Sequence, residues 1–226
     1  MRVPQPEGTR GSLKWIQRLA DQVPSLLDEP LRRAGCLERA RRLEWLSPLR
    51  DDAWAEYRDA GFLERIGHVG LTANLKAFWP SGGPQWDGLA TDGHGRVFLL
   101  EAKAHAPEMR SMCKARKTSL DLIRRSLQET KRELGASPES DWLTGYYQYA
   151  NRLAHLVFLT RNAIDARLVF LYFVGDEDLG GPSSIAQWEP HLSAAHVHLG
   201  LRERVDRVVS LFADVKDLHQ HGAVEP

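Results

Sequence analysis

The chain has 226 residues, and its 30 Lys and Arg residues balance 30 Asp and Glu residues, so its formal net charge is +0. This balance argues against a protein that coats nucleic acid through its overall charge, although it permits a local basic patch. The opening residues and the apolar runs lack the composition and length of a signal peptide or a membrane span. Cys36 and Cys113 form neither a zinc motif nor a disulfide framework. We therefore expect a cytoplasmic protein that does not associate with a membrane.

Residues 1–50 are expected to form an N-terminal arm and helices that pack on the rest of the chain. Residues 1–11 are rich in Pro and Gly, which is typical of a loose arm. Apolar residues then recur at helical spacing from Ser12, a plausible N-cap, whereas Trp45–Leu49 has the pattern of a short extended segment. One of the two aspartates at 51 and 52 is expected to cap a helix that runs to about Gly67.

The rest of the chain alternates predicted helices and strands. Helices are expected over Ser119–Leu134, Trp142–Thr160 and Ser183–Leu199, a buried strand over Ala166–Val174, and a strand or helix over Val205–Val215. A hairpin is expected before the first of these helices. This alternation predicts a single α/β domain over residues 51–226, with helices flanking a mixed sheet.

The hairpin contains a pair of acids that suggests chemistry. The turn DGHG over residues 92–95 joins two strand-like runs. If the turn is centred on His94, Asp87 lies directly opposite Glu101, with Cβ atoms about 4.5–5.5 Å apart. The two-residue period of a strand places Lys103 on the same face as Glu101. Opposed carboxylates repel each other unless one takes up a proton or a cation lies between them.

Oxygen ligands of this kind suit Mg²⁺ or Mn²⁺, and Lys103 beside them would position or activate an attacking water. The alternative is that Asp87 begins an exposed strand, while Glu101 and Lys103 lie in solvent at a strand end. The acid-x-Lys pattern recurs at Glu129-Thr-Lys131 and Asp214-Val-Lys216. Only the pattern at Glu101 combines an apolar strand, a hairpin and an opposed acid.

The segment WDGLATDGHGRVFLLEAK resembles the PD-(D/E)xK phosphodiesterase superfamily, which includes restriction endonucleases and many repair nucleases. The resemblance implies an αβββαβ core, in which one acid begins the second strand and (D/E)xK lies on the third. By position, Asp87 matches the first acid, Glu101 the second and Lys103 the lysine. Trp86 stands where the family pattern has proline. The resemblance covers about residues 52–174.

The resemblance also implies a Glu from the helix before the strands and a Gln from the helix after them. Glu64 and Glu56 both lie in the helix predicted before the hairpin, and we favour Glu64 slightly because it shares a stripe with apolar residues. Gln148 is the candidate from the later helix, with Arg152 and His155 on the same face. The alternative for each residue is an ordinary exposed position on a helix.

A strongly basic segment runs from Arg110 to Arg132, soon after Lys103. The residues expected to contact nucleic acid there are Lys114, Arg116, Lys117, Arg124 and Arg125. A basic patch close to the acids would hold phosphates in a salt-dependent way. The alternative is a solvated helix face.

Together these features predict a Mg²⁺-dependent nuclease, a hydrolase acting on phosphodiester bonds, with DNA as the expected substrate. Asp87, Glu101 and Glu64 are the expected metal ligands. Two alternatives stay open: a non-catalytic nucleic-acid-binding module of the same fold, and a structural protein that uses its Trp residues to bind a partner. Whether the chain forms a homodimer is also left open.

Overall fold

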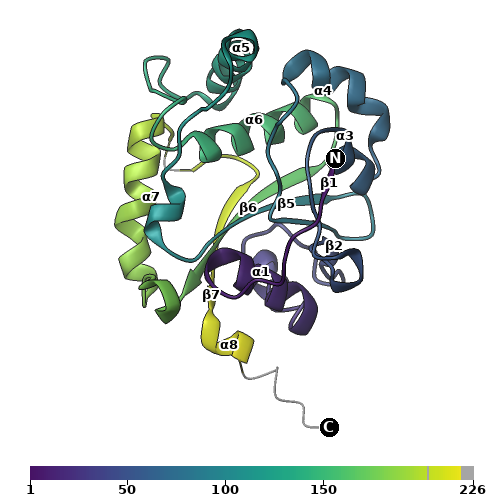
Figure 1. Ribbon diagram of the computed structural model, residues 1–226, viewed down its shortest axis with the longest axis vertical. Coiled ribbons are helices and arrows are strands. Elements are labelled where there is room, and N and C mark those ends of the chain that lie inside the picture. The colour runs from purple at the N-terminus through teal and green to yellow at the C-terminus, as the bar shows by residue number, and fades with distance from the viewer. Residues whose placement is uncertain (203, 220–226) are drawn as a thin grey trace.

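The computed structural model describes residues 1–202 and 204–219 and centres on a five-stranded mixed sheet (Figure 1). In spatial order its strands are β2 (Glu44–Ser47), β4 (Gly88–Thr91), β5 (Val97–Lys103), β6 (Ala166–Val174) and β7 (Val208–Asp214). The pairs β2–β4 and β4–β5 are antiparallel, whereas β6 and β7 continue the sheet parallel to β5. A small second sheet pairs β1 (Arg2–Val3) with β3 (Glu56–Tyr57). The predicted α/β class with a mixed sheet is confirmed.

Helices cover both faces of the sheet (Figure 1). One face packs against α3 (Asp59–Arg65), α4 (Thr72–Phe78), α5 (Lys117–Leu134), α6 (Tyr147–Arg161) and α7 (Ile185–Leu199), and the other against α1 (Gly11–Gln22), α2 (Asp28–Arg33) and α8 (Val215–His219). Short 3₁₀ turns are η1 (Arg50–Asp52), η2 (Val69–Leu71), η3 (Ala106–Met109) and η4 (Glu177–Leu179). No helix in the described part of the chain has the length and apolar character needed to cross a bilayer.

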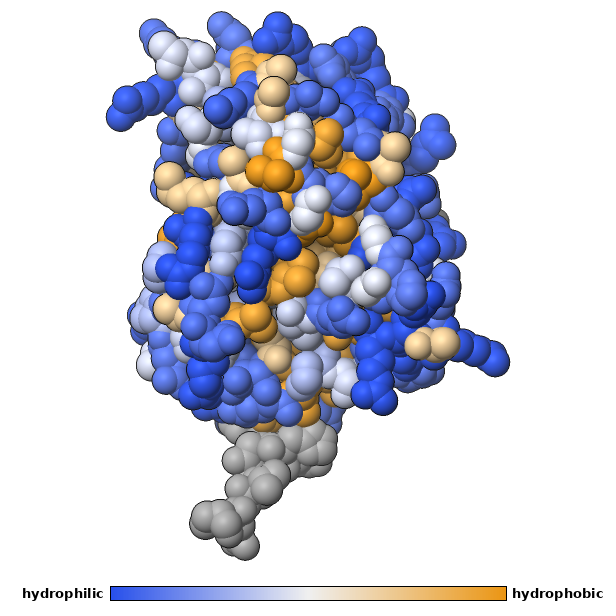
Figure 2. Space-filling view, turned by 90° about the vertical axis from the view of Figure 1, so that its right-hand side faces the viewer, coloured by the Kyte–Doolittle hydropathy of each residue, from blue (hydrophilic) through white to orange (hydrophobic). Residues whose placement is uncertain are grey.

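Strand β5 contributes to both cores because its side chains alternate between the two faces. Val97 and Leu99 belong to the core beneath α6, whereas Phe98 and Leu100 belong to the core beneath α1. The predicted alternation is confirmed, and Glu101 follows it onto the α6 side, where it meets a residue of that helix. Outside the cores, Figure 2 shows hydrophilic side chains over most of one face, with apolar ones gathered in a band along its middle.

The prediction of a helix from about residue 52 to Gly67 is wrong for the first half of this segment. Ala53 and Trp54 have positive φ angles of 52° and 53°, which a right-handed helix does not accept. The chain then forms β3, and only afterwards α3. Tyr57 of β3 makes an antiparallel bridge to Trp86, a contact between segments far apart in the sequence. This long-range pairing outweighs the helical pattern of the local sequence.

The first residues are also more ordered than a loose arm. Arg2 and Val3 form β1, and the Arg2 Nε donates a hydrogen bond of 2.7 Å to Asp52 Oδ1. Helix α1 has Arg10 rather than Ser12 at its N-cap position. Strand β1 was not predicted, because its pairing partner lies much later in the chain, whereas β2 overlaps the extended segment predicted over Trp45–Leu49.

Asp165, in the turn before β6, is bound by three arginines. It accepts hydrogen bonds from Arg96 at 2.8 Å, Arg167 at 2.5 Å and Arg207 at 2.7 Å. Burial opposes its ionisation, but these guanidinium groups lower the pKa of Asp165 to about 2. The side chain is 42% exposed, so solvent screening keeps its stabilising effect near 1 kcal/mol or below, about the value of a surface ion pair.

Asp165→Asn is therefore expected to weaken the acid dependence of stability. A depressed folded-state pKa gives stability that is present above the unfolded pKa of about 3.9 and is lost as the pH falls toward the folded value. Urea unfolding between about pH 4 and pH 2 should show a smaller loss in Asp165→Asn than in the parent chain. Asp206→Asn, whose side chain is 94% exposed and lies 3.7 Å from Arg207, is the matched control. Identical pH profiles for the two variants would contradict this assignment.

Candidate active site

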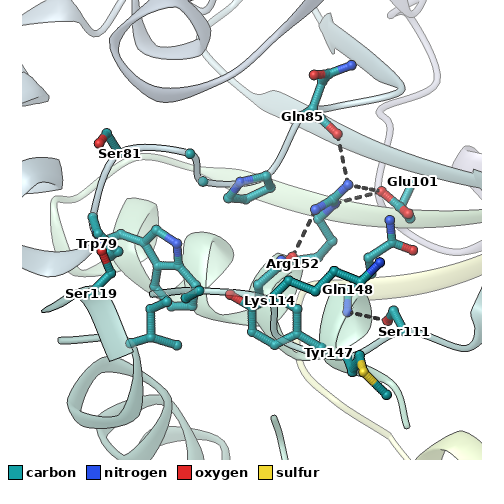
Figure 3. A pocket seen from close by; sticks show the side chains of 18 of the residues that line it. Trp79, Ser81, Gln85, Glu101, Ser111, Lys114, Ser119, Tyr147, Gln148 and Arg152 are labelled. Carbon is teal, nitrogen blue, oxygen red and sulfur yellow. Dashed lines mark hydrogen bonds and ion pairs between the residues drawn. The ribbon is translucent and has the colours of Figure 1, made fainter. Parts of the chain in front are cut away.

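A cleft of about 1040 Å³ lies beside the end of β5 (Figure 3). Its lining includes three acids, Glu56, Asp87 and Glu101, and two bases, Lys103 and Arg152. One wall is the loop of residues 79–85, another is the segment of residues 108–119, and α6 supplies Tyr147, Gln148 and Asn151. The acids and the lysine predicted from the hairpin therefore lie in one cleft.

The hairpin sets Asp87 against Glu101 as its turn predicted. Gly88 pairs with Leu100, so the residue before it lies opposite Glu101 at the next step of the ladder. Asp87 Oδ2 accepts a 2.7 Å hydrogen bond from the backbone N–H of Ala102. The chain bends away from β5 here, because the neighbouring Trp86 bridges to β3 instead. Asp87 is thereby held where β3, β4 and β5 meet.

Glu101 is buried between two cations, and its side chain is only 2% exposed. Its Oε1 accepts a hydrogen bond of 2.5 Å from Lys103 Nζ, and its Oε2 accepts one of 2.6 Å from Arg152 Nε. Burial opposes its ionisation, but the charges of Arg152 and Lys103 hold the pKa of Glu101 below its usual value. Burial likewise lowers the pKa of Lys103, but Glu101 and Asp87 outweigh it and raise that pKa. Glu101 and Lys103 are therefore an ionised pair.

The other two acids lack such compensation. Burial, and then the charge of Glu101, raises the pKa of Asp87 well above its ordinary value. Burial also raises the pKa of Glu56, although a 2.6 Å hydrogen bond from Gln85 Nε2 to its Oε2 acts in the opposite direction. Glu56, Asp87 and Glu101 thus lie in the same cleft as Lys103 and Arg152. A further positive charge beside Asp87 would relieve the repulsion between Asp87 and Glu101.

The donor set suits a hard divalent cation. Asp87 and Glu101 offer carboxylate oxygens, and Mg²⁺ commonly binds through one or two carboxylates while keeping several waters. Among residues 1–202 and 204–219, no three His, Cys, Asp or Glu side chains come together as a ready metal cluster. Asp87 and Glu101 are the two opposed carboxylates that could hold such a cation, with water in its other positions.

The structure does not bring Glu64 to this cleft, so the preference for it as a catalytic and metal-binding residue is wrong. Glu64 lies exposed on α3, whereas Glu56 is 7% exposed on β3 and lines the cleft. The reason is the strand that replaces the first half of the predicted helix, since it changes which residues face the sheet. Gln148 does line the cleft, and its backbone N–H donates a hydrogen bond of 2.8 Å to Ser111 Oγ (Figure 3).

The basic segment divides into two parts. Lys114 and Arg116 line the cleft, as does Arg110, whose guanidinium lies 4.5 Å from the centre of the Tyr146 ring. The other three predicted contact residues do not line the cleft: Lys117 and Arg124 are exposed elsewhere, and Arg125 borders a separate pocket beside Arg161.

Arg152 is the residue whose role the sequence signals least. Its Nη2 donates a hydrogen bond of 2.8 Å to the carbonyl of Gln85, and its Nη1 donates one of 2.8 Å to Asn151 Oδ1. Its guanidinium also lies 5.1 Å from the centre of the Trp86 ring. Figure 3 shows Arg152 reaching from α6 toward both Glu101 and Gln85. In the sequence, only the position of Arg152 one helical turn after Gln148 indicates that it faces the site.

Comparisons of the chain with models of protein families, with curated proteins and with solved structures found no match. The function must therefore be inferred from the residues of the cleft. Two features carry the most information: the opposed acids at the hairpin, and the half-buried lysine bonded to one of them.

Proposed function

We propose that the chain is a divalent-cation-dependent nuclease of the PD-(D/E)xK type that hydrolyses phosphodiester bonds in DNA. The observation that carries the proposal is the meeting of Asp87, Glu101 and Lys103 in one cleft, with Asp87 just before β4 and Glu101 on the adjacent β5. The order β2–β4–β5–β6, with α6 between β5 and β6 in the chain, supports an αβββαβ core. In that arrangement Asp87 precedes the second strand and Glu101-Ala-Lys103 ends the third.

Each residue would have a distinct role in hydrolysis. A bound Mg²⁺ would supply positive charge to the phosphate oxygens and lower the pKa of the attacking water. Asp87 and Glu101 would hold the cation, with Glu56 accepting hydrogen bonds beside them. The Lys103 ammonium, fixed by Glu101, would orient the water and stabilise charge that develops on the phosphate. Arg152 would keep Glu101 ionised and therefore able to bind.

A non-catalytic nucleic-acid-binding module is the second candidate, and one observation favours it. Lys103 and Arg152 occupy both carboxylate oxygens of Glu101. If Glu101 keeps these partners, the cleft would bind phosphate through its bases and leave the bond intact. The two candidates predict different results with Mg²⁺, because only the nuclease would convert a nucleic-acid strand into shorter products.

The deciding experiment is to incubate the purified chain with end-labelled DNA, in Mg²⁺, in Mn²⁺ and in EDTA. We expect shorter products with either cation and none in EDTA, because the cation supplies the charge that the phosphate needs. An RNA strand of the same sequence tests the choice of nucleic acid. Binding without cleavage in every condition would favour the non-catalytic module.

Charge reversal provides a matched pair of variants for the same experiment. Lys114→Glu with Arg116→Glu changes the cleft, whereas Lys117→Glu with Arg124→Glu makes an equal charge change on residues outside it. The first pair should weaken DNA binding about tenfold or more at low salt and reduce the salt dependence, because phosphate contacts release counterions. The second pair should have a much smaller effect. Equal losses for both pairs would contradict binding through the cleft.

A further inference from the structure

Glu101, Arg152 and Lys103 lie deep in the cleft. The side chains of Glu101, Arg152 and Lys103 are 2%, 5% and 12% exposed. A scissile phosphate would have to reach the cation that Asp87 and Glu101 would hold. The strand that carries this phosphate must therefore enter the cleft instead of resting across its opening.

The volume of the cleft suits one strand better than a duplex. Its volume of about 1040 Å³ is near the upper end of pockets that enclose a drug-sized ligand, about 300–1,000 Å³. This volume suits a few nucleotides of one strand. Duplex DNA is a stiff rod with a persistence length of about 50 nm. Its diameter exceeds the width of its major groove, which is about 12 Å. Its phosphates lie on the outside of that rod and cannot follow a buried path without separation of the strands.

Hydrogen bonds fix both walls, so the cleft is not built to widen. In the wall of residues 79–85, the backbone N–H groups of Gly82 and Gly83 donate to the Asp59 carboxylate at 3.2 Å and 2.9 Å. Trp79 in the same wall packs edge-on against His155, with ring centres 5.0 Å apart. Across the cleft, the segment of residues 108–119 is joined to the loop before α6 by backbone bonds from Ser111 and Cys113 at 2.9 Å and 2.7 Å.

The lining between these walls has the features that bind an unpaired strand. Proteins that hold single strands combine a basic groove for the backbone with apolar or aromatic surfaces for the bases. Lys114 and Arg116 provide the basic side, and both are exposed. Met112, which is 60% exposed, and the half-buried ring of Tyr147 provide surfaces for bases.

We propose that the substrate of this cleft is single-stranded nucleic acid, including the unpaired end or flap of a duplex, and not continuous duplex. The inference rests on the proposed nuclease function for its chemistry, but the shape of the cleft carries the choice of strand. Duplex DNA would enter only after its base pairs open. Each base-pair step that must open reduces the fraction of DNA able to react about tenfold.

The test uses one labelled DNA strand alone, in a blunt duplex, and with an unpaired flap. In Mg²⁺ we expect the free strand to be cut at least about 100-fold faster than the duplex, the cost of opening two steps. The flap should be cut only within its unpaired part. Duplex cut as fast as the free strand would overturn the inference while leaving the nuclease proposal intact.

Binding separates the two proposals if nothing is cut. Anisotropy in EDTA should show the free strand bound at least about tenfold more tightly than the blunt duplex, because the walls exclude the latter. That result without cleavage would support the substrate class and reject the nuclease. Equal or tighter binding of duplex would overturn the substrate class. Met112→Asp should weaken binding of the free strand severalfold, whereas Val197→Asp, at a 77% exposed site on α7, is the control with no expected effect.

Discussion

Asp87→Ala is expected to abolish Mg²⁺-dependent cleavage, with a fall in kcat/KM of at least about 10²–10³-fold. The estimate follows from the loss of a group that holds charge where the transition state needs it. Asp87 lies opposite Glu101, so its removal leaves the cation with one of its two proposed carboxylates. Lys103→Ala should have a comparable effect, because it removes the ammonium fixed beside Glu101. The measurement is a cleavage rate at saturating Mg²⁺, on the substrate that the chain cuts best.

The same variant should remain folded. Burial and the charge of Glu101 both disfavour the ionised form of Asp87. Removing the side chain relieves this repulsion and costs one hydrogen bond, which the Ala102 N–H donates. We expect thermal unfolding to change little. Asp214→Ala, which alters a second acid-x-Lys pattern outside the cleft, should keep the full rate. Full activity in purified Asp87→Ala or Lys103→Ala would reject the assignment.

Arg152→Met is expected to destabilise the fold by about 3–5 kcal/mol, the cost of leaving a buried charge without its partner. Arg152 is 5% exposed and donates to Glu101, to Asn151 and to the carbonyl of Gln85. Its loss leaves Glu101 with Lys103 alone and also frees the carbonyl of Gln85. Urea unfolding at neutral pH measures the change in the free energy of unfolding.

A double variant separates charge from packing. Glu101→Gln in the Arg152→Met background removes the anion that has lost one of its two cations, so it should restore part of the lost stability. If Arg152 acted mainly as a packing residue, the losses of unfolding free energy caused by Arg152→Met and by Glu101→Gln would add. A loss below about 1 kcal/mol for Arg152→Met alone would contradict the view that its charge is required.

The parts of the site predicted correctly depend on short-range patterns. The turn DGHG determines the pairing of β4 with β5, and the period of two residues determines which side chains share a face. These two rules are sufficient to place Asp87 opposite Glu101. The buried strand over Ala166–Val174 was also recognisable, because a run of this length and composition packs on both faces.

The parts that were missed depend on contacts between distant segments. Nothing in the local sequence around Glu56 predicts a strand, because β3 exists through its pairing with β1 and its bridge to Trp86. The role of Arg152 depends on how α6 is rotated against β5, which helical spacing does not specify. Composition likewise revealed a basic segment, but not that Lys114 faces the cleft while Arg124 does not.

The pairing of β1 with β3 has a practical consequence for handling this chain. β3 contains only Glu56 and Tyr57, and β1 aligns Val3 with Glu56. Arg2 and Val3 thus support a carboxylate of the cleft through this pairing, although neither of them lines it. An affinity tag before β1, or removal of its residues, would therefore disturb Glu56 indirectly. Assays are better made with a tag attached at another position.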